Sequence, residues 1–373
     1  MMDVQKIARP CILVRKEYVP GKPVEEVQRE YGITDIIKLA SNENPLGASP
    51  RAVEAMLREI QMNTNFYPES LCPSLTVKLA EKFKLTPGHF LIGNGADGVI
   101  TILGLTFINP GDECVMARLT FPVYEGIVGK MDGTSVFVPL TTDFRHDIDG
   151  MIKAITPKTK IVFLCNPNNP TSTIIRRDEF ERLIQAVPEN TLLIADEAYY
   201  EFVDDQDFPQ SLNYLEKYPN LIILRTFSKI MGLAGVRVGY AIAHPDLIRV
   251  MLKTREPFPV NRAAQAGALA AMDDHDFVAR TCQITAAGRK QLSEGLTQLG
   301  FKSFPGQANF VFADLGQPVA PVFEGLLREG VIIRPLGPQG APTCIRVSIG
   351  TPEQNERFLR AIKKVFAAVY QAV

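Results

Sequence analysis

Lys229 is the residue of this sequence whose type and position offer the most reactive chemistry. It lies in the stretch TFSKIMGLAGVRVGY (226–240), directly after the apolar run 221–224. This position predicts that its amine meets solvent at the carboxyl end of a buried strand, where open α/β sheets build ligand sites. A lysine in such a pocket can lose its charge and attack a carbonyl, forming a Schiff base. Taken alone, Lys229 also fits a surface lysine that follows a strand.

Groups that bind anions lie close to this lysine in the sequence. Thr226, Ser228 and Arg237 supply hydroxyl and guanidinium donors of the kind that hold a phosphate. They predict an anion site beside the reactive amine.

The segment FLIGNGADGVITIL (90–103) favours a second part of the same anion site. A strand, two glycines and the start of a helix follow one another there. The N–H groups of Ala96, Asp97 and Gly98 would then bind an anion at a helix N-terminus. The segment is neither GxGxxG nor a P-loop with its lysine, and on its own it fits an ordinary strand–helix turn.

Two further strand ends carry polar side chains. In LLIADEAYYEF (192–202), Asp196 ends a strand where burial is expected, and a buried carboxylate needs a cationic or strong donor partner. Tyr199 lies three residues further on and would point the same way. In IVFLCNPNNPTS (161–172), two Asn-Pro units force a turn that holds Asn169 at the edge of the sheet. Separately, Asp196 also fits a turn cap and Asn169 an ordinary loop residue.

Together these groups match the needs of a pyridine aldehyde that carries a phosphate arm. The amine of Lys229 would take the aldehyde, and Asp196 would keep the ring nitrogen protonated. A dinucleotide-binding fold would instead need a glycine fingerprint in its first strand–helix turn and an acidic residue about 20 residues on. The sequence has neither.

The elements that must position these side chains alternate between short apolar runs and helical patterns from about residue 75 to 270. Runs such as IVFLC are apolar on both faces, as strands covered by helices should be. This alternation predicts an α/β fold with a mostly parallel seven-stranded sheet flanked by helices, including helices at 97–107 and 178–186. The expected strands are 90–92, 113–117, 134–138, 160–165, 191–196, 221–226 and 236–243.

The rest of the chain predicts a smaller α+β domain, entered through a helix at 263–272. Its expected helices and strands are 276–299, 309–313, 319–329, 331–334, 344–349 and 353–370. We therefore expect an N-terminal arm at 1–40 that packs with the small domain or a partner subunit. A large domain would span 41–265 and a small domain 266–373.

The composition excludes several classes of protein. Forty basic and 41 acidic residues give a net charge of −1, so no electrostatic footprint for nucleic acid or an anionic membrane is present. The six cysteines and four histidines are scattered, which predicts neither a disulfide frame nor a metal site. The N-terminus lacks a signal-peptide core, and no apolar run has the length of a membrane helix. We expect a cytoplasmic enzyme that acts on small molecules.

Eight segments resemble, in order, the fold type I pyridoxal 5'-phosphate aminotransferases, and most closely the histidinol-phosphate aminotransferases. The resemblance covers nearly the whole chain. Each segment alone is moderately specific, and eight in sequence are strong. The segments are SNENPLG (41–47), FYPE (66–69), GNGAD (93–97), LTFPVY (119–124), CNPNNPT (165–171), DEAYYEF (196–202), TFSKIMGLAGVRVGY (226–240) and IRVSIGT (345–351).

This resemblance implies a role for each matching residue toward the cofactor ring. Lys229 would form the Schiff base and shuttle a proton, and Asp196 would pair with the pyridinium nitrogen. Asn169 and Tyr199 would bond the phenolic oxygen, and Phe121 would stack on the ring.

The resemblance also implies how phosphate and substrate are held. Tyr67 would reach the phosphate of the neighbouring subunit, which implies a homodimer with shared sites. Arg346 would grip the α-carboxylate of the amino donor, while Arg334 and Tyr18 would recognise the far end of the substrate, including a phosphate group. The phosphate of the cofactor would be held by Ala96, Asp97, Thr226, Ser228 and Arg237.

Three residues depart from the pattern of the family. Gly98 stands where a glutamate is usual, Ser172 replaces the glycine of NPTG, and Leu119 replaces a proline. None of them removes a group that contacts the cofactor.

The implied reaction is a ping-pong transfer of an amino group from L-glutamate to imidazole-acetol phosphate, which makes L-histidinol phosphate. The alternatives are an aromatic amino-acid aminotransferase, a phosphoamino-acid decarboxylase that uses the same cofactor, and a non-catalytic binding protein. The first of them shares this skeleton of motifs. Intact Lys229, Asp196 and Arg346 speak against the last.

Overall fold

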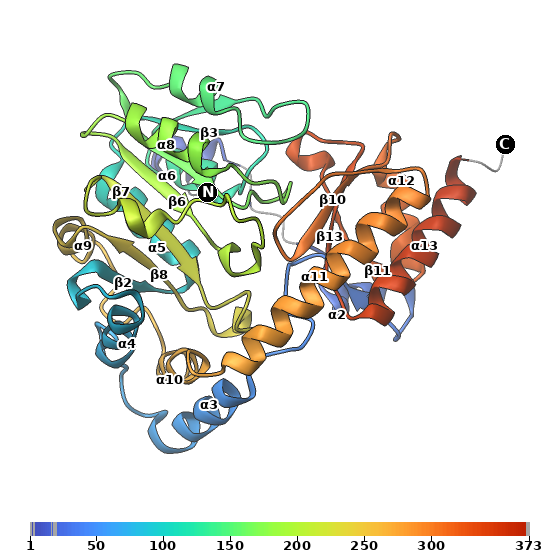
Figure 1. Cartoon of the computed structure of the whole chain (residues 1–373), viewed down its shortest axis with the longest axis horizontal. Coiled ribbons are helices and arrows are strands. Elements are labelled where there is room, and N and C mark those ends of the chain that lie inside the picture. The colour runs from blue at the N-terminus through green and yellow to red at the C-terminus, as the bar shows by residue number, and fades with distance from the viewer. Residues whose placement is uncertain (1, 3, 16, 18–20, 371–373) are drawn as a thin grey trace.

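The computed structural model describes every residue of the chain except 1, 3, 16, 18–20 and 371–373. A larger body contains the central sheet, and a smaller one carries the C-terminal elements (Figure 1). The long helix α11 (His275–Gln298) runs from the larger body into the smaller one. Within the described residues, no helix combines the length and apolar character needed to cross a membrane.

The large body is built on a seven-stranded sheet in the order β2-β8-β7-β6-β5-β3-β4. All neighbouring pairs are parallel except those of β8, which is antiparallel to both β2 and β7. The predicted fold class is therefore confirmed. The strands are β2 (Phe90–Gly93), β3 (Glu113–Ala117), β4 (Thr134–Val138), β5 (Thr159–Cys165), β6 (Leu192–Asp196), β7 (Leu221–Thr226) and β8 (Gly239–Ala243).

Residues of the central strands alternate between two buried clusters, one on each face of the sheet. Leu193 and Ile223 belong to one cluster, and their neighbours Ile194 and Ile222 belong to the other. Both faces must be apolar because helices cover each of them. The first face packs against α4 (Pro73–Phe83), α8 (Arg177–Ala186) and α10 (Arg262–Ala271), and the second against α5 (Gly95–Phe107), α6 (Val123–Lys130) and α9 (Pro245–Met251).

One expected strand is shorter than the sequence indicates. The apolar run 236–243 predicts a single strand, but β8 begins only at Gly239. A short helical turn at Ala234–Val236 precedes it, and Arg237 adopts a left-handed backbone with φ of 62°. That conformation cannot continue a strand, and it places the arginine at the end of the sheet where the candidate site lies.

The smaller body is an antiparallel sheet covered by helices. Its strand order is β12-β13-β10-β9. Helix α11 and the two helices that follow it in the chain pack together with this sheet around a mostly aliphatic core. A separate short pair joins β1 in parallel to β11, so residues near 37 lie beside the C-terminal part of the chain. The elements are β1 (Ile37–Lys38), β9 (Lys302–Ser303), β10 (Phe310–Asp314), α12 (Val319–Arg328), β11 (Val331–Ile332), β12 (Arg334–Pro335), β13 (Cys344–Ser348) and α13 (Pro352–Tyr370).

The N-terminal third contributes helices that the sequence pattern does not predict. Among them are α2 (Val24–Tyr31), which packs near α12, and α3 (Pro50–Asn63), which packs against α10. Ser49 caps α3 by accepting a hydrogen bond from the Ala52 N–H, and Pro50 occupies the first helical position. Two shorter helices are also not predicted: α1 (Pro10–Leu13), in the same third of the chain, and α7 (Ile148–Lys153), which lies further along it.

Candidate active site

The candidate site lies at the carboxyl ends of β5, β6 and β7, where the loops that follow these strands meet β13. This is the position that open α/β sheets use for ligands. Segment 40–42, from the N-terminal part of the chain, enters the same region through hydrogen bonds to Arg346, Ser348 and Tyr199. Three parts of the chain far apart in sequence therefore converge on one place.

Lys229 follows β7 and extends its amine into this region. Its Nζ donates to the carbonyl of Ser41 over 3.3 Å and lies 5.7 Å from the centre of the Tyr199 ring. Burial lowers the pKa of the Lys229 amine from 10.5 to about 8, and the charge of the Arg346 guanidinium acts in the same direction. The amine is therefore partly uncharged near neutral pH, as nucleophilic attack requires.

Asp196, the last residue of β6, is a buried carboxylate held by two donors. The Tyr124 hydroxyl donates to one of its oxygens, and the Ala198 N–H donates to the other over 3.1 Å. Burial raises the pKa of the carboxyl from 3.8 to about 6, although both hydrogen bonds favour the charged form. Among the described residues no basic side chain pairs with Asp196. The Asp196 carboxylate could therefore pair with the cationic group of a ligand.

Asn169 and Tyr199 contact each other and share partners from other elements. The Asn169 amide nitrogen donates to the Tyr199 hydroxyl over 3.3 Å, and the Asn42 amide donates to the same hydroxyl over 3.0 Å. Arg346 donates to the Asn169 amide oxygen over 2.6 Å and also to the Ala40 carbonyl. Because an arginine can only donate, the Asn169 amide must present its oxygen to Arg346 and its nitrogen to Tyr199.

The residues predicted to bind an anion gather around the N-terminus of α5. Arg237 reaches the start of this helix, where its guanidinium lies 3.3 Å from the Asp97 carboxylate. A side chain on Gly95 would fall on that guanidinium, and one on Gly239 would fall on the N–H of Ala96. The two glycines therefore keep open the end of a helix whose first N–H groups have no partner within the helix.

Two hydroxyl groups lie near this helix end. Thr226 donates to the Ser228 hydroxyl over 3.0 Å and accepts from the Ser228 N–H over 3.1 Å. Gly239, which borders the helix end, is the partner of Thr226 across the β7–β8 pair. The structure thus brings together all five groups predicted to bind the phosphate.

A buried ion pair holds the ends of β6 and β7 side by side. Arg225 donates from two nitrogens to one oxygen of Glu197 over 2.9 and 2.8 Å, and both side chains are buried. The guanidinium also lies 3.6 Å from the centre of the Tyr200 ring. Because Glu197 follows Asp196, this pair fixes the backbone directly beside the buried carboxylate.

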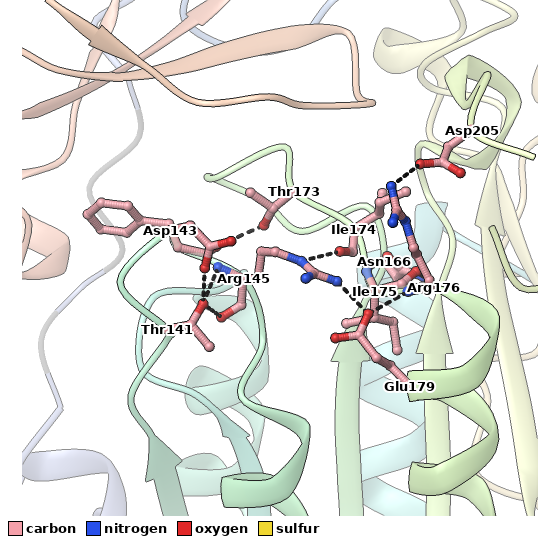
Figure 2. A network of polar contacts seen from close by, with 11 residues as sticks. Thr141, Asp143, Arg145, Asn166, Thr173, Ile174, Ile175, Arg176, Glu179 and Asp205 are labelled. Atoms are coloured by element: carbon pink, nitrogen blue, oxygen red, sulfur yellow. Dashed lines mark hydrogen bonds and ion pairs between the residues drawn. The ribbon is translucent and has the colours of Figure 1, made fainter. Parts of the chain in front are cut away.

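A polar network fixes the loop that carries Asn169 to the large body (Figure 2). Asn166 bonds the backbone of Ile175 in both directions, over 3.0 and 3.4 Å. Arg145 donates to the Ile174 carbonyl over 3.1 Å and pairs with Glu179 at the start of α8. The loop is therefore held on both sides of Asn169.

Phe121 and Arg334 lie beside residues of this group, whereas Tyr67 lies apart from it within one chain. Phe121 packs edge-on against Tyr124 at 5.5 Å, and Arg334 lies opposite Arg346 in the register of β12 and β13. Tyr67 is 80% exposed and stacks on Phe258, so within one chain it does not reach the site. Tyr18 lies outside the described residues.

Three residues of the site have no role predicted from the sequence. Tyr124 bonds Asp196, Asn42 bonds Tyr199, and Ser348 bonds Asn42 through its hydroxyl over 2.7 and 2.9 Å. All three lie within or beside motifs quoted from the sequence. In the sequence only their position within a motif marks these three residues, because hydroxyl and amide groups have no reactive chemistry that would distinguish them.

The arrangement fits a pyridine ring with an aldehyde and a phosphate. It offers an amine of lowered pKa, a buried carboxylate without a cationic partner, and an open helix end beside an arginine. Within the described part of the chain, no three His, Cys, Asp or Glu side chains gather as metal ligands do.

Solved structures with the same architecture are aminotransferases. A histidinol-phosphate aminotransferase from Sinorhizobium meliloti, in complex with pyridoxal-5'-phosphate, superposes with a TM-score of 0.89 at 28% identity. That match covers 96% of this chain and 97% of the other. A mutant of Thermus thermophilus aspartate aminotransferase has a TM-score of 0.84 at 26% identity, covering 97% and 99%. Fold and site together therefore define an α/β protein of the aminotransferase type.

Comparison of sequences gives the family. The model of aminotransferase class I and II matches residues 34–362, and the chain belongs to this family. A histidinol-phosphate aminotransferase from Moorella thermoacetica is 47% identical over 360 residues, covering 96% of this chain and 93% of that protein. Histidinol-phosphate aminotransferase 2 from Pseudomonas aeruginosa is 42% identical over 369 residues, covering 98% and 100%.

Proposed function

We propose that this protein is a pyridoxal 5'-phosphate-dependent aminotransferase. It exchanges an amino group between L-glutamate and imidazole-acetol phosphate, giving 2-oxoglutarate and L-histidinol phosphate in histidine biosynthesis. The observation that carries the proposal is the meeting of the Lys229 amine, the Asp196 carboxylate and the Arg346 guanidinium at one edge of the sheet. The names of relatives that are 40–47% identical over nearly their whole length support the same substrate.

Each part of the site would hold one part of the cofactor. Lys229 would bind the carbonyl carbon, Asp196 the ring nitrogen, Asn169 and Tyr199 the phenolic oxygen, and Phe121 one face of the ring. When bound, the cofactor supplies an electron sink for the carbon that loses its proton. The phosphate would be held by Ala96, Asp97, Thr226, Ser228 and Arg237, with Tyr67 of the second subunit.

Lys229 would also move the proton. An amine whose pKa burial lowers to about 8 can accept a proton at Nζ and return it near neutral pH. Asp196 must be ionised to hold a proton on a ring nitrogen, and its pKa of about 6 leaves it ionised at pH 7. Tyr124 and Ala198 keep that carboxylate in place throughout.

The two arginines on neighbouring strands suit substrates with two anionic groups. Arg334 and Arg346 are directly opposite in an antiparallel pair, so their side chains leave the same face of the sheet. Like charges in that position are unfavourable unless an anion lies between or beside them. Glutamate offers two carboxylates and the second substrate a phosphate, whereas an aromatic amino acid would leave one arginine without an anion.

We propose a homodimer in which Tyr67 completes the partner's site. Large apolar side chains are exposed along α3 and the segment that follows it, which contains Tyr67, and at Phe258, on which Tyr67 stacks. A patch of this kind marks a protein interface more often than free surface. Its members are Leu57 (55% exposed), Ile60 (52%), Met62 (69%), Phe66 (60%), Leu71 (56%) and Phe258 (46%).

We propose that the chain divides into an N-terminal arm at 1–40, a large domain at 41–265 and a small domain at 266–373. The pairing of β1 with β11 supports a contribution of the N-terminal segment to the small domain. The six cysteines are all free thiols, which favours a reducing compartment such as the cytoplasm.

A panel of amino donors tests the substrate. The wild-type protein should use L-histidinol phosphate with a kcat/KM well above that for phenylalanine or tyrosine. Arg334→Ala should lower this value for histidinol phosphate about 10- to 100-fold, because a charged hydrogen bond is lost, and should change phenylalanine far less. Arg328→Ala, an exposed arginine on α12, is the matched control. Equal use of the aromatic donors by the wild-type protein would favour the alternative substrate.

A further inference from the structure

Ser172 combines a backbone conformation suited to glycine with a buried side chain. Its φ is 63°, in the left-handed region that residues with a Cβ rarely adopt. The residue is fully buried, three positions after Asn169 in the same loop. A serine under local strain needs an interaction that glycine cannot make.

That interaction comes from the small domain. The Ser172 hydroxyl accepts a hydrogen bond from the Ala308 N–H over 2.9 Å, and its carbonyl accepts from the Gln307 N–H over 2.8 Å. Gly306 lies just before these donors, and a side chain on it would overlap the Ser172 hydroxyl. Serine on one segment and glycine on the other are therefore complementary in shape.

The contact closes a ring of hydrogen bonds around the candidate site. From Ala308 the chain continues to Asn309, whose amide donates to the Asn42 carbonyl over 3.0 Å. Asn42 donates to Tyr199, and Asn169 donates to the same hydroxyl. The ring returns along the backbone from Asn169 to Ser172.

The other end of this loop is fixed to the large body. Thr173 donates to the Phe144 carbonyl over 2.8 Å, and Arg145 bonds Ile174 (Figure 2). Ser172 thus lies between a segment held by the large body and the small-domain residues that lead into β10. Arg346 of β13 pairs in register with Phe312 of β10 and donates to Asn169. A shift of β10 relative to the loop would move Arg346 away from Asn169.

We propose that Ser172, together with Gly306, is a positioning residue. The pair sets the spacing between the Asn169 loop and strands β10 and β13, and so keeps Asn169 in contact with Arg346 and Tyr199. The kinetic and cofactor-titration parts of its test rest on the proposed function, and the amide-exchange part does not.

Ser172→Gly tests the hydrogen bond in the holoenzyme. The variant relieves the left-handed strain but removes the acceptor for Ala308. Amide exchange of peptides covering 304–309 should rise about two- to tenfold, and the KM for the amino donor should rise by a similar factor with kcat less affected. The visible absorption of the bound cofactor should titrate at a shifted pH, because Asn169 is predicted to bond its phenolic oxygen. Lys84→Gly is the control, because it also replaces a left-handed residue (φ 55°) but one that is exposed; it should match wild type in all three measurements.

Gly306→Ala tests the complementary shape. This variant should raise the KM and the exchange of 304–309 more than Ser172→Gly does, because its methyl group overlaps the serine hydroxyl. Ser172→Gly/Gly306→Ala should return both quantities most of the way to the level of Ser172→Gly. The overlaps with the serine side chain are then gone, and the closest remaining contact of the methyl group is with the carbonyl oxygen of residue 172 at 3.2 Å. If Gly306→Ala alone does not fold, recovery of soluble, active protein by the double variant gives the same support.

Three results would overturn the proposal. Exchange of 304–309 and KM unchanged in Ser172→Gly would show that the contact positions nothing. A lower Tm in Ser172→Gly with normal KM and a normal cofactor titration would show a structural role only. If adding Ser172→Gly does not relieve the defect of Gly306→Ala, the two residues do not act as a pair. The exchange measurements need no substrate, so they stand even if the proposed reaction fails.

Discussion

Replacing Asp196 by asparagine should stabilise the cofactor-free protein while weakening its hold on the cofactor. Burial raises the pKa of this carboxyl from 3.8 to about 6, which means that the folded protein disfavours the ionised form. The difference corresponds to about 3 kcal/mol of stability that the ionised group removes. Asparagine is nearly the same size and carries no charge.

The change in hydrogen bonding reduces this gain. The asparagine oxygen can still accept from the Ala198 N–H, and its amide nitrogen would donate to the Tyr124 oxygen. The Tyr124 proton would then turn toward Cys165, a weaker acceptor within reach. We assign about 1 kcal/mol to this rearrangement, which leaves a net gain of about 2 kcal/mol.

The stability difference between Asp196→Asn and the wild-type protein should depend on pH, and its direction follows from the raised pKa. Below about pH 4 the carboxyl is protonated in both folded and unfolded chains, so its pKa contributes nothing. Between pH 4 and 6 the unfolded chain ionises first, and the wild-type protein therefore loses stability as pH rises. Above about pH 7 the carboxyl is ionised in both states, and the loss is complete and constant. The advantage of Asp196→Asn should appear over this interval and then level off.

Urea unfolding of the two cofactor-free proteins from pH 4 to 8.5 measures this difference directly. The variant should be about 2 kcal/mol more stable at pH 8 and slightly less stable at pH 4. In the same variant the Kd for pyridoxal 5'-phosphate should rise about tenfold or more, because a neutral amide cannot pair with a protonated ring nitrogen. A stability difference that is independent of pH, or a variant less stable at pH 8, would refute the assignment of burial as the cause.

Three further predictions follow from the site. In the cofactor-free protein, acylation of Lys229, followed by mass spectrometry, should have its midpoint at about pH 8, and a midpoint above about pH 10 would contradict the lowered pKa. Lys229→Ala and Tyr67→Ala should each be inactive, yet their 1:1 mixture after subunit exchange should recover about a quarter of wild-type activity if sites are shared between two subunits; no recovery would mean that Tyr67 serves its own chain. Gly239→Ala should raise the Kd for the cofactor at least about tenfold by filling the space beside the Ala96 N–H, and equilibrium dialysis with inorganic phosphate as competitor would show whether the phosphate subsite is affected.

The sequence predicts the sheet well because its strands are recognisable one at a time. Runs such as 192–196 and 221–226 are apolar on both faces, and that pattern depends only on the helices covering them. The start of β8 is wrong in the prediction because the left-handed backbone of Arg237 is a local exception that an apolar run does not reveal.

The candidate site divides in the same way. Asp196 ends a strand, and Lys229 and Asn169 each follow one, so position in the sequence places them at the same edge of the sheet. Asn42 and Ser348 bond each other across 306 positions and belong to no strand end of the large sheet. Their contribution depends on how the two bodies pack against each other. The periodicity of residues along the chain carries no information about that packing.

Three residues of the candidate site have backbone conformations that are locally unfavourable. Asn42, Ser172 and Arg237 all have positive φ, at 55°, 63° and 62°, in positions where glycine would be less strained. In each of them the side chain makes a contact that glycine lacks: with Tyr199, with the Ala308 N–H and with Asp97. Strain persists only where surrounding contacts hold it. Glycine at these positions should therefore relax the backbone and still impair the site, because the lost contact joins segments that the fold alone does not align.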